Sequence, residues 1–182
     1  MNKILRYVMM TVMALCLSIP CFGGAAEAAT IALLPLVNNT QDDMGGKIFY
    51  KEAIAVINSQ KGFMMVENKK LDAAIEAANV TTAVPDESAL AKIAKDGDVD
   101  IVIAIQLDKL DSKTIYSSEE NKLEMNIKGY AVAYNRITGK FYEHKIYNDN
   151  VVPEVFSSRW NVAHEEWGQT VRYEVKRALN HK

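Results

Sequence analysis

The chain has little cysteine, and both of its cysteines lie near the start. Cys16 and Cys21 are the only two among 182 residues. Neither combines a small residue directly before it with an aliphatic residue three positions before it, as a lipoprotein signal requires. If the chain is cut after both of them, the remaining protein has no disulfide and no thiolate chemistry.

The chain also lacks an excess of positive charge. Its formal net charge is −2 at pH 7, and acidic and basic residues are interspersed along its length. Binding to a phosphate backbone requires a basic stripe or patch. We therefore expect no nucleic-acid partner.

Long hydrophobic runs are missing except at the amino terminus. Lys3 and Arg6 precede an apolar stretch, residues 8–19, that is too short to cross a bilayer comfortably. Ala26-Glu27-Ala28 then offers the small-x-small pattern that a signal peptidase recognises. The sequence therefore predicts a secretory signal over residues 1–28.

Cleavage at Ala28 or Ala29, between which the pattern does not decide, would place the protein in the bacterial periplasm or outside the cell. No stable membrane span would remain. A retained membrane anchor is the alternative interpretation. The remaining residues, 29–182, suit a single α/β domain in length.

Apolar patterns over the first half of the domain predict parallel strands joined by helices. We expect strands at 30–37, 63–67 and 99–107, and helices at 44–59, 69–78 and 87–95. Asp86 is a suitable N-cap for the third helix, and Gly97 ends it. Alternating strands and helices favour parallel pairing with right-handed crossovers.

The pattern changes in the second half. Residues 123–137 alternate between apolar and more polar side chains, Gly139 provides a tight turn, and 141–148 returns as an antiparallel hairpin. A long helix follows over 153–180, with an apolar stripe that we expect to pack on the sheet rather than on a membrane. The predicted fold is a three-layer α/β arrangement around a mixed sheet, in the order β-α-β-α-α-β-β-β-α.

No group of residues indicates catalysis. Met44-Gly45-Gly46-Lys47 lacks the spacing and the following Ser or Thr of a phosphate-binding loop, and loop flexibility with an exposed lysine explains it better. His164-Glu165 lacks a second histidine, because position 168 is glycine. We therefore predict no catalytic residue, no metal ligand and no cofactor.

Four segments resemble bacterial envelope domains: the amino-terminal domain of TolB, the curli-secretion lipoprotein CsgG and the penicillin-binding-protein activator LpoB. The segments are residues 31–40, 62–68, 91–103 and 133–140, the last with the turn Ile137-Thr138-Gly139-Lys140. The resemblance implies their α/β fold and an accessory role in the envelope. Many relatives are lipoproteins, whereas this chain lacks a lipoprotein signal. The membrane-inserting hairpins of the secretion channel have no counterpart here.

Two functions follow as hypotheses. The first is an exported, non-enzymatic accessory protein that binds an envelope protein through a sheet edge, the loop over residues 38–43, or a hairpin surface that carries tyrosines (Tyr130, Tyr134, Tyr142 and Tyr147). The alternative is a small-molecule binding protein or hydrolase that uses the crevice at the carboxyl ends of the parallel strands. Asn38, Asn39 and Thr40 would form its binding loop, with Gln106 or Asp108 nearby.

Overall fold

The computed structural model describes residues 28–80, 83–153 and 159–180. The predicted secretory signal lies outside these residues apart from Ala28, so it stays a prediction, as does the division into signal and domain. The last helix was predicted to begin at Pro153, which is wrong because Pro153 is the last residue of a strand. Residues 154–158 of that predicted helix also lie outside the described part of the chain.

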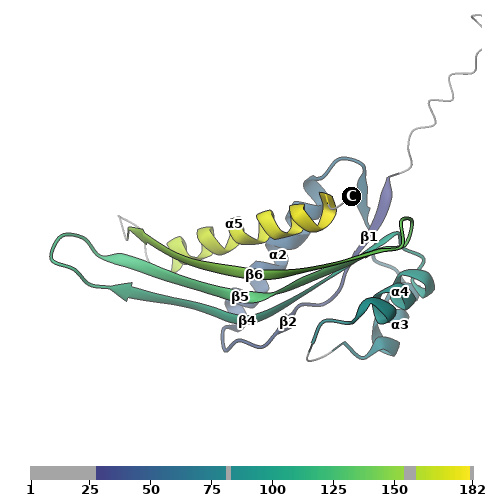
Figure 1. The fold of residues 1–182 in the computed structure, drawn as a ribbon, viewed down its shortest axis with the longest axis horizontal. Helices are drawn as coiled ribbons and strands as arrows, with labels where there is room; N and C mark the ends of the chain where they lie inside the picture. Colours follow the sequence, from purple (N-terminus) through teal and green to yellow (C-terminus); the bar gives the residue numbers. More distant parts are fainter. Residues whose placement is uncertain (1–27, 81–82, 154–158, 181–182) are drawn as a thin grey trace, which may run out of the picture.

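A six-stranded mixed sheet forms the centre of the protein (Figure 1). Five strands follow one another across the sheet in the order β3-β1-β4-β5-β6, and β2 pairs with β4 beside β1. β1 pairs in parallel with β3 and β4, and β2 pairs in parallel with β4, whereas the β4–β5 and β5–β6 pairs are antiparallel. The strands are β1 (Ala29–Leu33), β2 (Val37–Asn38), β3 (Phe63–Met65), β4 (Ile101–Ile115), β5 (Lys122–Asn135) and β6 (Lys140–Pro153).

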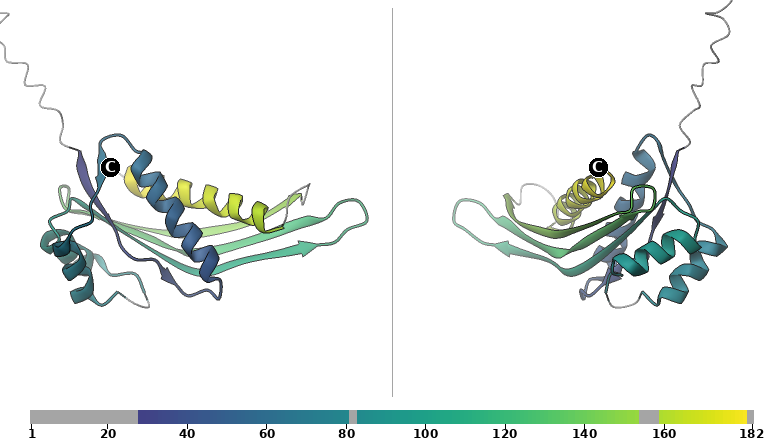
Figure 2. Two further views of the ribbon diagram at one scale, coloured as in Figure 1. Left: turned by 180° about the vertical axis from the view of Figure 1, so that it is seen from behind. Right: turned by 45° about the vertical axis from the view of Figure 1, so that its right-hand side comes forward.

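Helices cover both faces of the sheet and make three layers, as predicted (Figure 2). α2 (Asp43–Ser59) and α5 (Arg159–Asn180) lie together on one face. α3 (Lys69–Ala78) and α4 (Glu87–Asp96) lie on the other face, at the end of the sheet near β1. The opposite end, built from β4, β5 and β6, extends beyond the helices as an arm.

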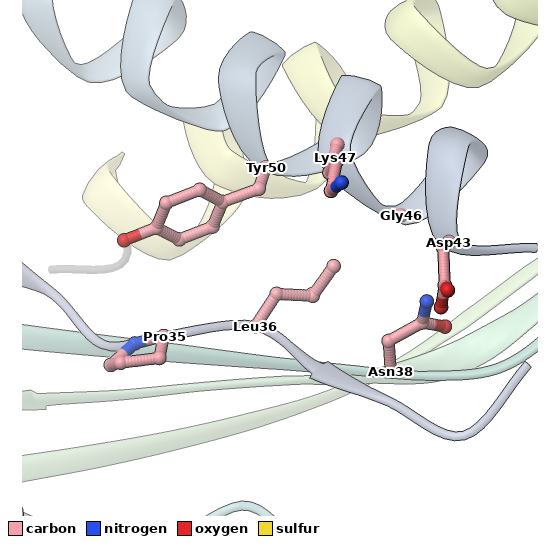
Figure 3. A pocket seen from close by; sticks show the side chains of 7 residues that line it. All are labelled: Pro35, Leu36, Asn38, Asp43, Gly46, Lys47 and Tyr50. Atoms are coloured by element: carbon pink, nitrogen blue, oxygen red, sulfur yellow. The ribbon is translucent and has the colours of Figure 1, made fainter.

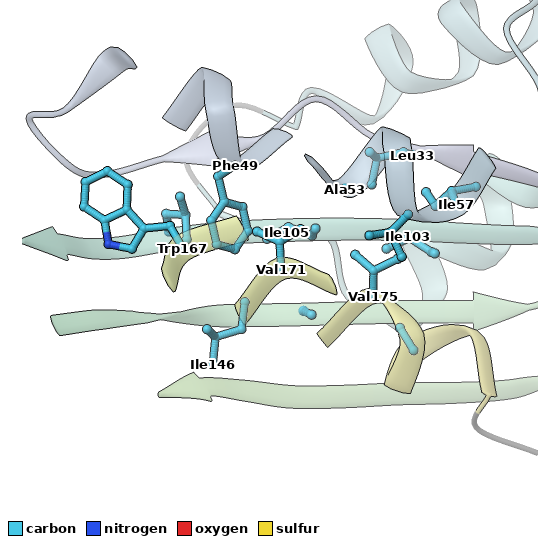
Figure 4. Packing of buried hydrophobic residues seen from close by; sticks show 14 of the residues in the cluster. Leu33, Phe49, Ala53, Ile57, Ile103, Ile105, Ile146, Trp167, Val171 and Val175 are labelled. Carbon is cyan, nitrogen blue, oxygen red and sulfur yellow. The ribbon is translucent and has the colours of Figure 1, made fainter. Parts of the chain in front are cut away.

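Each face of the sheet has its own hydrophobic core. Figure 4 shows the larger core: Phe49 of α2 lies beside Ile105 of β4, with Trp167 of α5 beyond it, and Val175 of α5 lies near Ile103. The smaller core joins α3 and α4 to the other face of the same strand. β4 therefore contributes side chains to both cores. Because burial of apolar surface is the main stabilising force, this strand stabilises the fold from both of its faces.

Several predicted local signals are confirmed. Asp86 caps α4 by accepting a hydrogen bond from the Ala89 amide at 2.8 Å, and Gly97 ends that helix. Gly139 has φ +65° in the turn between β5 and β6. Trp167, Val171 and Ala178 of the α5 stripe are buried against the sheet, as predicted.

The prediction of a single strand over 30–37 is wrong. The structure divides it into β1 and β2, which pair with β4 at Ile101–Ile103 and at Gln106–Leu107. Pro35 lies between them; it has no amide hydrogen and restricts the residue before it, so the parallel ladder is interrupted there. The order of strands therefore contains one more than predicted.

The later strands are longer than predicted. β4 was expected to end at residue 107 but runs to Ile115, and β6 runs to Pro153 rather than 148. Beyond residue 107 only one face of β4 is covered, so its residues alternate instead of forming the continuous apolar run that marks a strand buried on both faces.

The four tyrosines of the hairpin do not share one surface. Tyr142 pairs opposite Ala133 and packs on the α2–α5 side, whereas Tyr134 packs on the α3–α4 side. Of the four, only Tyr147 is largely exposed, at 64%. None of the helices in the described ranges is long and apolar enough to span a membrane.

Asp100 holds the starts of β1 and β4 together. One of its carboxylate oxygens accepts hydrogen bonds from the Thr30 amide at 3.0 Å and the Thr30 hydroxyl at 2.9 Å, and the other accepts from Arg136 at 3.0 Å. These bonds hold the pKa of Asp100 below its ordinary value, the bond from the Thr30 amide most strongly.

We therefore expect Asp100 to make stability depend on pH. The folded state favours the carboxylate, so its contribution is present above the unfolded pKa of about 4 and is lost as the pH falls through the lower folded pKa. Asp100→Asn should lower the free energy of unfolding by about 1 kcal/mol or more at pH 7, and flatten its decline between neutral pH and strong acid, measured by urea unfolding. Asp96→Asn, which removes an exposed ion pair with Lys92, should cost less than about 0.5 kcal/mol at pH 7. An unchanged pH profile in Asp100→Asn would contradict this assignment.

Candidate functional site

The predicted binding loop is closed by its own hydrogen bonds. The side-chain oxygen of Asn38 accepts from the amide of Thr40 at 3.1 Å and from its hydroxyl at 2.7 Å. The side-chain nitrogen of Asn38 donates to the Asp42 carbonyl at 3.2 Å. Asn residues often close turns in this way. Both ends of the Asn38 amide are therefore already engaged in holding the loop.

The loop leads directly into α2. Asp42 is the N-cap of this helix and accepts a hydrogen bond from the Gly45 amide at 2.7 Å. Gly45 and Gly46 lie in its first turn rather than in a flexible loop, which corrects the sequence interpretation. A Cβ at Gly46 would lie 2.5 Å from the side-chain nitrogen of Asn38, so glycine allows the helix to approach the loop. The pair of glycines serves packing, not phosphate binding.

Asn39 belongs to a different network, centred on Asp108. One Asp108 oxygen accepts from the Asn39 side chain at 3.1 Å and from the Gln106 side chain at 2.7 Å. Gln106 in turn accepts from the Val84 amide at 3.1 Å. The prediction that Gln106 and Asp108 lie beside the loop is confirmed. The network ties the loop, β4 and the segment before α4 together.

Asp108 lies at an irregularity of β4, not at its end. The pairing of β4 with β5 shifts register between Leu107 and Lys109, which leaves Asp108 without a partner residue in β5. Such bulges redirect side chains. Gly129, opposite Leu107, makes this possible, because a Cβ there would lie 2.0 Å from the Gln106 carbonyl oxygen.

A cavity of about 510 Å³ lies between α2 and the segment that connects β1 to β2 (Figure 3). Of the three predicted loop residues, only Asn38 lines it. Pro35 and Leu36 form its apolar side, while Lys47 and Tyr50 line it from α2. Tyr50 donates to the Leu33 carbonyl at 3.4 Å, and burial raises its pKa. The cavity could hold a small, mostly apolar molecule.

A cluster of polar side chains between α5 and β6, with Glu174 buried in it, was missed by sequence reasoning. Glu174 of α5 is only 6% exposed and lies 2.9 Å from His144 of β6. Burial raises the pKa of Glu174, although His144 and Arg177 oppose the shift. Arg177 lies 3.0 Å from the same His144 nitrogen. The three-residue spacing of Glu174 and Arg177 on one helix face was the available signal. The cluster fastens α5 to the edge of the sheet.

Within residues 28–80, 83–153 and 159–180, no three His, Cys, Asp or Glu side chains gather as a metal site would require. The loop and the cavity bring together amides, a lysine and a tyrosine. Their geometry offers binding groups, most of which already have partners in the fold.

The sequence matches no protein-family model and no curated protein. Among solved structures, the chain resembles a hypothetical protein of Chlamydia trachomatis, with a TM-score of 0.55 at 10% identity, over 85% of this chain and 99% of that one. This likeness shows the fold alone.

Two further structures match at lower scores. A lipoprotein of Neisseria meningitidis gives a TM-score of 0.46 at 16% identity, over 84% of this chain and 99% of that one. The C-terminal domain of LpoB from Escherichia coli gives 0.38 at 12% identity, over 68% and 84%. TM-scores below 0.5 do not establish a relationship, so the sequence resemblance to LpoB, like that to TolB and CsgG, stays a prediction.

Replacing Gly129 should test whether the irregularity at Asp108 depends on a missing side chain. Gly129→Ala would force the backbone of β4 and β5 apart, and we expect it to lower the free energy of unfolding by roughly 2 kcal/mol or more. The measurement is urea unfolding followed by circular dichroism. Gly168→Ala is the matched control, because a Cβ there meets nothing closer than 3.6 Å and alanine favours a helix interior by up to about 1 kcal/mol. Equal stability of the wild type and Gly129→Ala would show that the strands can part without cost.

Proposed function

We propose that this chain is an exported accessory protein of the bacterial envelope that binds a protein partner and catalyses no reaction. Lys3, Arg6 and the short apolar stretch that follows support export. The sequence resemblance to envelope domains supports the accessory role. The periplasm is the proposed location.

The exposed apolar end of the arm carries this proposal. Tyr116, between β4 and β5, is 81% exposed, and Ile115 and Val151 are 39% and 49% exposed. The pairing places Ile115 and Val151 on the same face of the sheet. The arm extends past the helices, so this end is accessible from several sides (Figure 1). Exposed aromatic and aliphatic side chains that gather at one place are typical of protein interfaces.

The polar loop over residues 38–43 is a poorer binding surface for a partner than the end of the arm. The side-chain amides of Asn38 and Asn39 both form hydrogen bonds within the fold. A ligand that used them would have to break those bonds, which costs free energy. The end of the arm requires no such exchange, so it is the better candidate for binding a protein.

We expect the double variant Ile115→Asp with Tyr116→Asp to lose the partner. The tagged wild-type chain should recover a specific protein from an envelope fraction, identified by mass spectrometry. The double variant should recover at least about tenfold less, because truncating central apolar contacts typically costs over 1 kcal/mol each.

Ile137→Asp is the matched control, since Ile137 is 69% exposed at the opposite end of the sheet. It should recover as much partner as the wild type. Circular dichroism should show that all three proteins are folded. If the envelope fraction yields no partner, or if Ile137→Asp abolishes recovery equally, the proposed role of the arm is wrong.

A second candidate function is small-molecule binding, and the cavity beneath α2 is the observation that favours it. Leu36 gives it an apolar side, and Lys47 provides an exposed cation at its rim. A small molecule with an apolar part and a polar head would satisfy both, since Asp43 also lines the cavity. Asn38 would form part of the cavity wall and, with Thr40, would hold the loop, while Asn39 would tie the loop to Asp108.

A thermal-shift screen against nucleotides, sugars, fatty acids and metal ions tests this candidate. A ligand of the cavity should raise the melting temperature of the wild type, and the rise should disappear in Leu36→Trp, which fills the cavity. Lys61→Ala, at an exposed position beyond the end of α2, should keep the full rise. If no compound gives a rise, or if Leu36→Trp retains it, the cavity is not the ligand site.

A further inference from the structure

β6 lies at the open edge of the sheet. It pairs with β5 along its whole length, from Lys140 opposite Asn135 to Pro153 opposite Lys122. No other described strand pairs with its outer side. Every second residue of such an edge presents an unpaired amide and carbonyl, which makes a long edge strand a ready partner for another strand.

We infer that a second copy of this chain pairs with β6 through the same strand, antiparallel, about a two-fold axis at Tyr147. A two-fold interface joins identical patches, so residues at equal distances before and after Tyr147 face each other. Lys145 then faces Asp149 of the second copy, and Asp149 faces its Lys145. Two opposite-charge pairs flank a central pair of tyrosines.

The geometry of β6 places these groups correctly. Lys145, Tyr147 and Asp149 lie on one face of the sheet, opposite Tyr130, Lys128 and Asn126 of β5. Tyr147 is 64% exposed and donates to Asp149 at 3.1 Å. Directly opposite cross-strand pairs of opposite charge, and pairs of aromatic rings, stabilise sheets.

The other face of β6 accepts the same register. There Ile146 faces Asn148, His144 faces Asn150, and Tyr142 faces Val152. None of these pairs joins like charges. His144 faces an uncharged residue and keeps its contacts with Glu174 and Arg177 in its own copy.

Most neighbouring registers are worse. A continuous sheet keeps facing residues on the same side, so the axis must pass through a residue. An axis at Ile146 sets Glu143 against Asp149, and an axis at Lys145 or Asp149 sets that charge against itself. An axis at Asn148 gives no opposite-charge pair.

One competing register also joins opposite charges. An axis at His144 sets Lys145 against Glu143, but it pairs only residues 140–148, whereas the axis at Tyr147 pairs residues 141–153. It also sets His144 against its own copy. The longer register forms more backbone hydrogen bonds and is therefore the one we infer.

Charge reversal tests the pairing in the full chain. Sedimentation velocity over a concentration series should show a dimer for the wild type. Asp149→Lys and Lys145→Asp should each weaken it roughly tenfold or more, because two attractive cross-strand pairs become repulsive. The double variant Lys145→Asp with Asp149→Lys should restore the dimer to within about threefold.

Glu143→Lys is the control that separates the two registers. Glu143 faces Val151 when the axis is at Tyr147, so the dimer should persist; an axis at His144 predicts its loss. A monomer at every concentration, a dimer indifferent to Asp149→Lys, or a double variant that fails to restore it would each overturn the inference.

Cysteine cross-linking gives an independent measurement. In a chain with Cys16→Ser and Cys21→Ser, no cysteine remains. Tyr147→Cys should then form a disulfide-linked dimer under mild oxidation, because facing residues of antiparallel strands have Cα atoms about 4.5–5.5 Å apart. Lys145→Cys should not, since its own copy lies four positions away along the strand. Linkage at position 145 without linkage at 147 would also overturn the inference.

Discussion

One strand, β4, sets the constraint on which the rest of the structure depends. Its first half lies between parallel β1 and antiparallel β5 and is buried on both faces. Ile103 and Ile105 point toward α2 and α5, while Val102 and Ala104 point toward α3 and α4. Both cores therefore require the same seven residues, Ile101–Leu107, in one register. A slip by a single residue would exchange the two faces, so this register is strongly specified.

The second half of the same strand produces the arm. After Asp108 only the face toward α2 and α5 is covered, and Leu110 is the first buried residue of that stretch. Gly129 lets the backbones meet closely at the change. The transition from core strand to projecting arm thus costs one unpaired residue. Asp108 is that residue, and its side chain accepts hydrogen bonds from Asn39 and Gln106, so the change in β4 also positions the loop that leads into α2.

Sequence patterns could predict the elements that periodicity and caps determine. The span of α3, the Asp86 cap and the parallel pairing of β1, β3 and β4 follow from apolar spacing and short-range chemistry. The division of the first predicted strand at Pro35 was not predicted, because the apolar run continues through that proline. The length of the arm could not be predicted, because the residues of β4 after 107 lack a continuous apolar run and become a strand by pairing with β5. The Asp108 network and the Glu174–His144 cluster join residues far apart in sequence, which no local pattern reveals.

The edge formed by β6 shows how an exposed strand can be both protected and specific. Charged residues on an edge usually serve to discourage pairing with other chains. Here Lys145 and Asp149 lie on one face at equal distances from Tyr147, so they complement a copy in reverse orientation. Shifting the axis to Ile146, Lys145 or Asp149 brings like charges together. Lys145 and Asp149, the latter with Glu143 in the Ile146 register, therefore disfavour those registers and favour the one at Tyr147. An edge that only avoided pairing would need no such symmetry, and charges of a single sign would serve it better.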